Sequence, residues 1–146
     1  MLNAIFPIFV RGRGAVGLLA VRIVTGAAFI LHGWPKIQSP MDWMGPKAPV
    51  PGVLQAAAAV AEFGGGIALI VGLLTPLFSL LLVFTMAVAI AVHISQGDPF
   101  FSPTQGPAYE LAAVYFANNL MLLLVGPGII SLDAALFSRS ARTPPD

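Results

Sequence analysis

Residues 53–94 read VLQAAAAVAEFGGGIALIVGLLTPLFSLLLVFTMAVAIAVHI, and this stretch decides the fold. It contains two segments, Val53–Leu74 and Pro76–Ile94, that are apolar all round, a pattern typical of helices surrounded by lipid. Each is long enough to cross a hydrocarbon core of about 30 Å as a helix, which satisfies its backbone groups internally. Thr75 is expected to cap the second helix, and Pro76 suits a first helical position that needs no amide donor. The pattern therefore predicts a tight antiparallel hairpin.

Two further segments, Ala15–Gly33 and Pro107–Val125, have the same length and character. The first is expected to end at Trp34-Pro35, where a proline-rich loop begins. Ser131-Leu132-Asp133 is a helix-start signal and predicts a short interfacial helix through Phe137. The sequence thus predicts an all-α fold: one membrane-embedded, antiparallel four-helix domain over residues 1–146, with a short C-terminal interfacial helix.

The composition excludes several classes of protein. Hydrophobic residues make up 58% of the chain and charged residues only 9%, whereas soluble domains average about 25% charged residues. The mean hydropathy of +0.90 agrees with a bilayer environment. The net charge of +1 is too small to suggest a nucleic-acid partner. There is no cysteine, which removes disulfides, thiol redox chemistry and thiolate-held metal clusters together.

The basic residues predict the orientation in the membrane. Four of the seven flank the two chain ends, and two lie on the opposite side. The first group is Arg11, Arg13, Arg139 and Arg142, and the second is Lys36 and Lys47. The positive-inside rule then predicts a multi-pass protein of the inner (plasma) membrane with both termini in the cytoplasm. Residues 2–10 are expected to lie on the membrane surface, and residues 138–146 to form a disordered tail.

Two charged residues lie within the predicted membrane segments. A charge at the bilayer centre costs about 2.5–3.5 kcal/mol and normally has a partner inside the bundle. Arg22 lies near the middle of its segment, and the depth of Glu62 differs from it by about 6 Å. The sequence therefore predicts an intramembrane ion pair between Arg22 and Glu62, with a structural or a functional role. A row of small residues, Ala57, Ala61 and Gly65, predicts close helix packing beside Glu62.

A second group of polar residues is expected at the outer end of the bundle: His32, Lys36, Gln55, His93 and Glu110. We predict that His32, His93 and Glu110 face a common cavity. Lys36 and Gln55 are expected at its rim, and Glu62 at its floor. Two histidines and a carboxylate suit a metal site, a proton-exchange site or a hydrogen-bonding pocket for a quinone head group. Plain solvation by interfacial water is the alternative, and no metal ligand is assigned.

The order and spacing of several blocks resemble the DoxX family of membrane proteins, which includes the DoxD-like proteins. The resemblance runs from about Gly17 to Leu136. It is carried by RIVTGAAFILHGWPK (22–36), PGVLQAAAAVAEFGGGIALIVGLLT (51–75), MAVAIAVHISQGDPF (86–100), Tyr109-Glu110 and GPGIISLD (126–133). The chain departs from the family pattern at Pro76 and at Ile129-Ile130, where a basic residue is frequent. These departures weaken the charge asymmetry on which the predicted orientation depends.

The resemblance implies a link to redox systems, and three functions compete for the chain. Some family members are similar to subunits of a thiosulfate:quinone oxidoreductase or accompany a terminal quinol oxidase, and others are membrane scaffolds in oxidative-stress defence. The favoured prediction is an accessory or scaffold subunit of a quinone-linked redox system, with quinone as the ligand and a membrane or peripheral redox protein as partner. The alternatives are a stand-alone quinone-binding oxidoreductase and a transporter or channel for small solutes or protons. A homo-oligomer is compatible with each of them.

Overall fold

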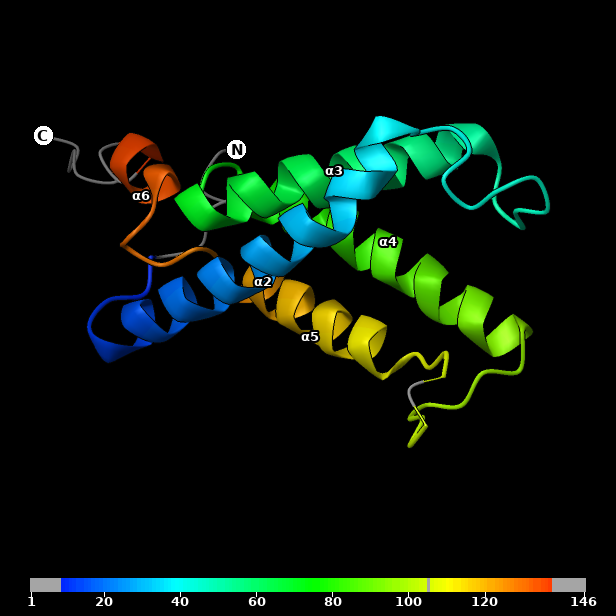
Figure 1. The fold of residues 1–146 in the computed structure, drawn as a ribbon. Helices are drawn as coiled ribbons and strands as arrows, with labels where there is room; N and C mark the ends of the chain where they lie inside the picture. Colours follow the sequence, from blue (N-terminus) through cyan, green and yellow to red (C-terminus); the bar gives the residue numbers. More distant parts are fainter. Residues whose placement is uncertain (1–8, 105, 138–146) are drawn as a thin grey trace, which may run out of the picture.

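The computed structural model describes residues 9–104 and 106–137, and within these ranges all regular structure is helical. The predicted all-α fold class is thereby confirmed. The chain runs through the helices of Figure 1 in the order α2 (Arg13–Gln38), α3 (Gly52–Val71), α4 (Thr75–Ser95), α5 (Glu110–Val125) and α6 (Leu132–Phe137). The expected surface segment 2–10 falls largely, and the expected tail 138–146 wholly, outside the described residues.

Three helices, α2, α3 and α4, are long and apolar enough to cross a membrane. The fourth apolar helix, α5, is shorter at 16 residues. Its predicted start at Pro107 was too early. The backbone N–H groups of Tyr109 and Glu110 instead donate to the carbonyls of Pro99 and Phe100, at 3.3 and 2.9 Å. These bonds hold residues 107–109 as an extension of the preceding loop.

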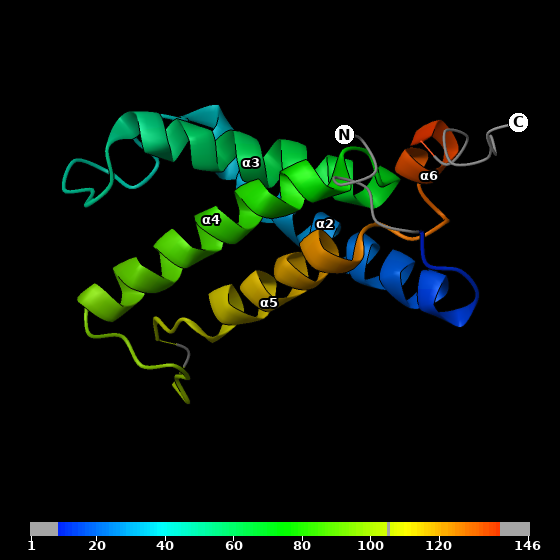
Figure 2. The ribbon, with the colours of Figure 1, turned by 180° about the vertical axis from the view of Figure 1, so that it is seen from behind.

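The helices form two close pairs, α2 with α3 and α4 with α5. The α3–α4 hairpin joins the pairs at one end, which we call the terminal end because α2 begins there and α5 ends there. The pairs diverge toward the opposite end, as both ribbon views show (Figures 1 and 2). We call this the loop end, because it carries residues 39–51 and 96–109.

Helix α2 is longer than expected, because it continues past Gly33 and through Pro35 to Gln38. A proline inside a helix removes one hydrogen-bond donor and crowds the preceding turn, which bends the helix without necessarily ending it. The ribbon of α2 changes direction in this region (Figure 1). As a result Lys36 belongs to the last turn of a helix packed against α3.

Two glycines allow α2 and α3 to approach closely. A Cβ added at Gly26 would lie 2.6 Å from the Gly66 carbonyl oxygen, and one at Gly66 would lie 2.7 Å from the Gly26 carbonyl oxygen. The residues of the predicted small-residue row do not form this contact, because they face other parts of the molecule. Gly65 faces Leu82 of α4, while Ala57 and Ala61 line a cavity described below. The α2–α3 contact therefore depends on Gly66, one position along from the predicted row.

Candidate functional site

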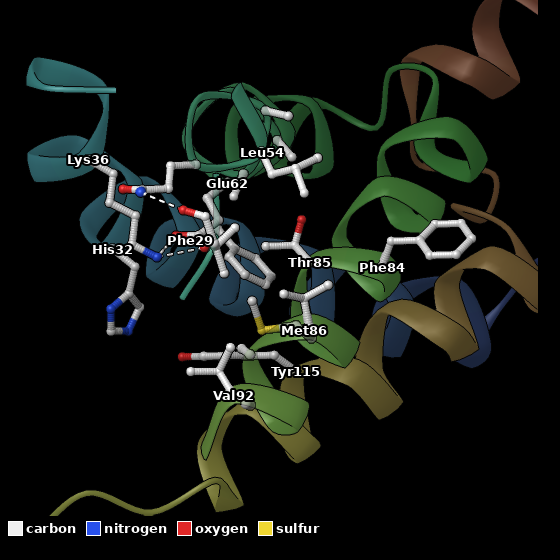
Figure 3. A pocket seen from close by; sticks show the side chains of 18 of the residues that line it. Phe29, His32, Lys36, Leu54, Glu62, Phe84, Thr85, Met86, Val92 and Tyr115 are labelled. Atoms are coloured by element: carbon white, nitrogen blue, oxygen red, sulfur yellow. Dashed lines mark hydrogen bonds and ion pairs between the residues drawn. The ribbon is translucent and has the colours of Figure 1, made fainter. Parts of the chain in front are cut away.

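A cavity of about 500 Å³ lies where the two helix pairs diverge. Its walls come from α2, α3, α4 and α5, and residues 39–51 contribute Trp43, Met44 and Val50. Figure 3 shows the lining side chains, which are mostly apolar, with Lys36 and Glu62 close together at one side. Binding sites for small molecules have volumes of about 300–1,000 Å³ and mostly apolar walls with a few polar groups. The cavity is therefore large enough for a small organic ligand.

The principal charged feature of the cavity is an ion pair between Lys36 and Glu62. Lys36 Nζ donates to Glu62 Oε1 at 2.7 Å and to Oε2 at 2.6 Å. The Glu62 side chain is only 2% exposed, whereas that of Lys36 is 23% exposed. Nζ also lies 4.4 Å from the centre of the Trp43 ring, which places the ammonium group over an aromatic face. Lys36 is thus the polar group that the ion pair leaves partly accessible.

The predicted ion pair between Arg22 and Glu62 is wrong, because each residue has other partners. Arg22 is 1% exposed and donates to four backbone carbonyls at the terminal end. Its Nε donates to Leu69 at 2.8 Å and Nη2 to Ile70 at 3.0 Å, in the last turn of α3. Its Nη1 donates to Pro127 at 2.9 Å and to Ile130 at 2.7 Å. Arg22 therefore binds backbone carbonyls at the end of α3 and in the loop that follows α5.

A second polar contact at the terminal end joins the C-terminal segment to the hairpin. Asp133 accepts hydrogen bonds from the backbone N–H groups of Leu74 at 2.7 Å and Thr75 at 2.8 Å. A carboxylate at a helix N-terminus satisfies free donors and complements the helix dipole. The cap of α4 is therefore Asp133, and the expected capping role of Thr75 is wrong. The Thr75 hydroxyl has no hydrogen-bond partner among the described residues.

Gln55 lines the cavity but directs its polar atoms to the loop 39–51. Its Oε1 accepts from the Met44 N–H at 3.0 Å, and its Nε2 donates to the Val50 carbonyl at 2.9 Å. Trp43 Nε1 donates to the Gln55 carbonyl at 3.0 Å. Gln55 is 3% exposed, so these bonds replace water for a buried amide. Gln55, which was expected at the rim of the cavity, therefore anchors the loop 39–51.

The two histidines both line the cavity, but the expected cluster with Glu110 does not form. His93 Nδ1 lies 2.7 Å from Asp98 Oδ2, so an imidazole N–H bonds a carboxylate in the following loop. His32 meets the Tyr115 ring edge-on, with centroids 6.2 Å apart. Glu110 is exposed at the start of α5 and does not contribute to the cavity wall. Over residues 9–104 and 106–137, no three His, Asp or Glu side chains gather as a metal site would require.

Sequence reasoning missed three residues of these two polar regions: Trp43, Tyr115 and Asp133. Trp43 was not included among the candidate site residues, although it lines the cavity and its ring lies under Lys36 Nζ. Tyr115 belongs to no motif that would mark it as part of the site, although it lines the cavity. Asp133 did stand in a helix-start signal, but its bonds go to α4 and not to its own helix. Only Trp43 had a usable signal, its place in a proline-rich loop beside Lys36.

These features define a class of protein: a multi-pass helical membrane protein with a ligand-sized cavity between two helix pairs. The chain belongs to the DoxX family, whose model matches residues 17–94. It is 32% identical to the inner membrane protein YqjF of Escherichia coli K12, over 83% of this chain and 92% of that protein. It is 34% identical to an uncharacterized protein of Haemophilus influenzae Rd, over 84% of this chain and 92% of that protein. No solved structure matches the chain at a significant level.

Proposed function

We propose that this DoxX family protein binds a quinone in the cavity and acts as an accessory or scaffold subunit of a quinone-linked redox system. The observation that carries the proposal is the chemical division of the cavity wall. Lys36 and Glu62 lie together at one side, and most of the remaining wall is apolar. A quinone has the matching division, because its ring carbonyls accept hydrogen bonds and its substituents are apolar.

Lys36 is the donor that we assign to the quinone carbonyl. An ammonium group has three N–H donors, and Glu62 accepts from Nζ through both of its oxygens. The partly exposed ammonium can direct its remaining donor capacity into the cavity. Glu62 then holds Lys36 in place, and Trp43 presents an aromatic face beside it. A buried pair of opposite charges also keeps the site neutral, as suits a neutral ligand.

We place the protein in the inner membrane with both termini in the cytoplasm. The printed name of the Escherichia coli relative supports the membrane, and the distribution of basic residues supports the orientation. An accessory role is favoured because the sequence contains no cysteine, and so offers no thiol or cysteine-held cluster to carry electrons. A redox protein that exchanges electrons with the bound quinone is the partner this role requires.

Quinone binding is tested by fluorescence quenching with the purified protein in lipid nanodiscs. The Trp34→Phe variant leaves Trp43 as the single indole, and Trp43 lines the cavity. Decylubiquinone is expected to quench Trp43 saturably. Lys36→Met is expected to weaken binding by about tenfold or more, because it removes a hydrogen bond from a charged donor. Lys47→Met is the matched control, since Lys47 is exposed in the loop 39–51 that follows α2 and does not line the cavity.

The doubly neutral variant Lys36→Met/Glu62→Gln provides a second measurement if Lys36→Met fails to fold, because it leaves no unpaired buried charge. Quenching that never saturates, and is equal in all variants, would mean that quinone only partitions into the lipid. Co-purification in mild detergent tests the accessory role, with a stoichiometric redox protein as the expected result. Quinone turnover by the isolated chain would instead establish the stand-alone oxidoreductase.

A further inference from the structure

The loop 39–51 borders the cavity at its polar side, where it contributes Trp43, Met44 and Val50. Residues 39–51 cross the loop end there and are fixed by three hydrogen bonds to Gln55. Lys36 Nζ lies over the ring of Trp43, which belongs to this loop. A ligand whose head group reaches Lys36 therefore meets this loop, and a long substituent is expected to leave the cavity on another side.

The side between α2 and α5 is bridged by aromatic contacts. The ring of Tyr115 from α5 lies 5.0 Å from that of Phe29 and 6.2 Å from that of His32, centroid to centroid. Phe29 is fully buried, so this contact forms part of the core. These three side chains join the two helix pairs on the face opposite to α3 and α4.

The side between α3 and α4 is different, because its lining residues are both apolar and exposed. Leu54 of α3 is 57% exposed, and Phe84 of α4 is 64% exposed, yet both line the cavity. Ala57 lies one turn from Leu54, and Leu81 and Val88 lie one turn either side of Phe84. We call the opening between these five residues the lateral slot. Both ribbon views show α3 and α4 moving apart toward the loop end (Figures 1 and 2).

The residues of the lateral slot indicate that it opens to lipid and not to water. All five of its residues are apolar, so they offer no hydrogen bond to an aqueous solute. Thr85 lies between Leu81 and Val88 on the same helix, and its hydroxyl donates to the Leu81 carbonyl at 2.9 Å. Its single donor is therefore already used. An apolar slot in a membrane-spanning helix pair opens to the acyl chains that surround it.

We infer that the lateral slot is the entrance to the cavity from the bilayer, and that the apolar tail of the bound ligand lies in it. This inference rests on the proposed quinone binding and names the class of ligand more closely: an amphipathic lipid with an acceptor head group and a long apolar tail. The inference assigns the head group to the side of Lys36 and the tail to the gap between Leu54 and Phe84, three residues labelled in Figure 3. Small water-soluble quinones lack the part that the slot recognises.

The test compares two benzoquinones with the same ring, one without a tail (2,3-dimethoxy-5-methylbenzoquinone) and one with a decyl tail. Burial of even two methylene groups strengthens binding by roughly tenfold, so the tailed compound should bind at least that much more tightly. Ala57→Phe is expected to fill the slot and abolish the preference for the tailed compound over the tailless one. Val60→Phe is the matched control, because Val60 is 57% exposed on the same helix and does not line the cavity.

A second measurement tests the slot whether or not quinone binds. A phosphatidylcholine with a nitroxide on its acyl chain should quench Trp43 in the Trp34→Phe background, and Ala57→Phe should reduce this quenching while Val60→Phe does not. Equal affinity for both quinones, or equal quenching in the two phenylalanine variants, would overturn the inference. If the acyl-chain probe reaches Trp43 through the slot but neither quinone binds, the proposed quinone function fails while the lipid entrance stands.

Discussion

Lys36 and Glu62 form a two-pronged ion pair across α2 and α3, with Nζ at 2.7 and 2.6 Å from the two carboxylate oxygens. The pair depends on the part of α2 that follows Pro35, since only a helix that continues to Gln38 brings Lys36 against α3. Glu62 lies 2% exposed on the opposite helix. The position of one proline-containing turn therefore determines which basic residue neutralises the buried carboxylate.

Removing one member of this pair should be costly. Lys36→Met leaves the Glu62 carboxylate buried without its cation, and is expected to lower the free energy of unfolding by about 3–5 kcal/mol. The doubly neutral variant Lys36→Met/Glu62→Gln should be milder, because no unpaired charge remains. Unfolding in detergent, followed by circular dichroism, gives the four values of the double-mutant cycle. Arg22→Met and Glu62→Gln supply the control cycle, and their effects should add within about 0.5 kcal/mol.

Coupling between Arg22 and Glu62 in that control cycle, together with additivity between Lys36 and Glu62, would contradict the arrangement described above. The expected additivity follows from the separate partners of the two residues. Within the described part of the chain, Glu62 bonds Lys36 and Arg22 bonds backbone carbonyls.

Gly72 is expected to be much less tolerant of alanine than Gly97. Both have positive φ, at 70° and 80°, so alanine should cost each about 1–2 kcal/mol of backbone strain. A Cβ at Gly72 would also overlap the Arg22 guanidinium, which four hydrogen bonds hold in place, whereas one at Gly97 has nothing within 4 Å. A Cβ at Gly72 would also lie 2.6 Å from Ser131 Cβ, so the difference in thermal unfolding temperature between the variants measures both overlaps. Equal shifts would show that Arg22 and Ser131 move aside freely.

Two nearby glycines of α3, Gly64 and Gly66, should respond in opposite directions to substitution. Gly66→Ala places a methyl group against the Gly26 carbonyl and should destabilise the protein by about 1–3 kcal/mol through overpacking. Gly64→Ala has nothing within 4 Å and should be neutral or stabilising, because alanine favours the helix by about 1 kcal/mol. Unfolding in the same detergent measures both. A destabilising Gly64→Ala would indicate an assembly contact on that face of α3.

The predicted orientation can be tested with a single engineered cysteine, since the chain has none of its own. Ala48 lies in residues 39–51, at the loop end of the molecule. Ala48→Cys is expected to react with a membrane-impermeant maleimide added outside intact spheroplasts. A cysteine placed at Gly12 should react only after the membrane is opened. The reverse pattern would place the termini outside the cell and overturn the positive-inside assignment.

The fold was largely predictable because hydropathy and helix-breaking residues act locally. The hairpin at Thr75-Pro76 and the short helix from Leu132 to Phe137 were both expected from a few adjacent residues. The errors lie at the ends of helices. Pro35 was taken as a terminator although α2 runs through it, and Pro107 was taken as a start although α5 begins at Glu110. Proline is compatible with both outcomes, and packing against neighbours decides between them.

The candidate site was less predictable, because its polar partners are distant in sequence or belong to the backbone. The residues at the outer end were correctly expected to include cavity-lining groups, and His32, Lys36, Gln55 and His93 are among them. Estimated depth alone paired Arg22 with Glu62. Depth gives no information about rotation around a helix, nor about carbonyls such as Pro127 and Ile130 that become acceptors only after folding.

The bonds of Arg22 also set an order of events during synthesis. Arg22 leaves the ribosome 105 residues ahead of Pro127, one of the carbonyls that it binds. Asp133, which caps α4, follows Thr75 by 58 residues. The hairpin therefore enters the bilayer with donors and acceptors at its turn still unpaired by protein, and water or lipid head groups must satisfy them meanwhile. Completion of this end of the molecule is therefore a late step in biogenesis. A chain truncated before Pro127 would reach the membrane but could not complete this step.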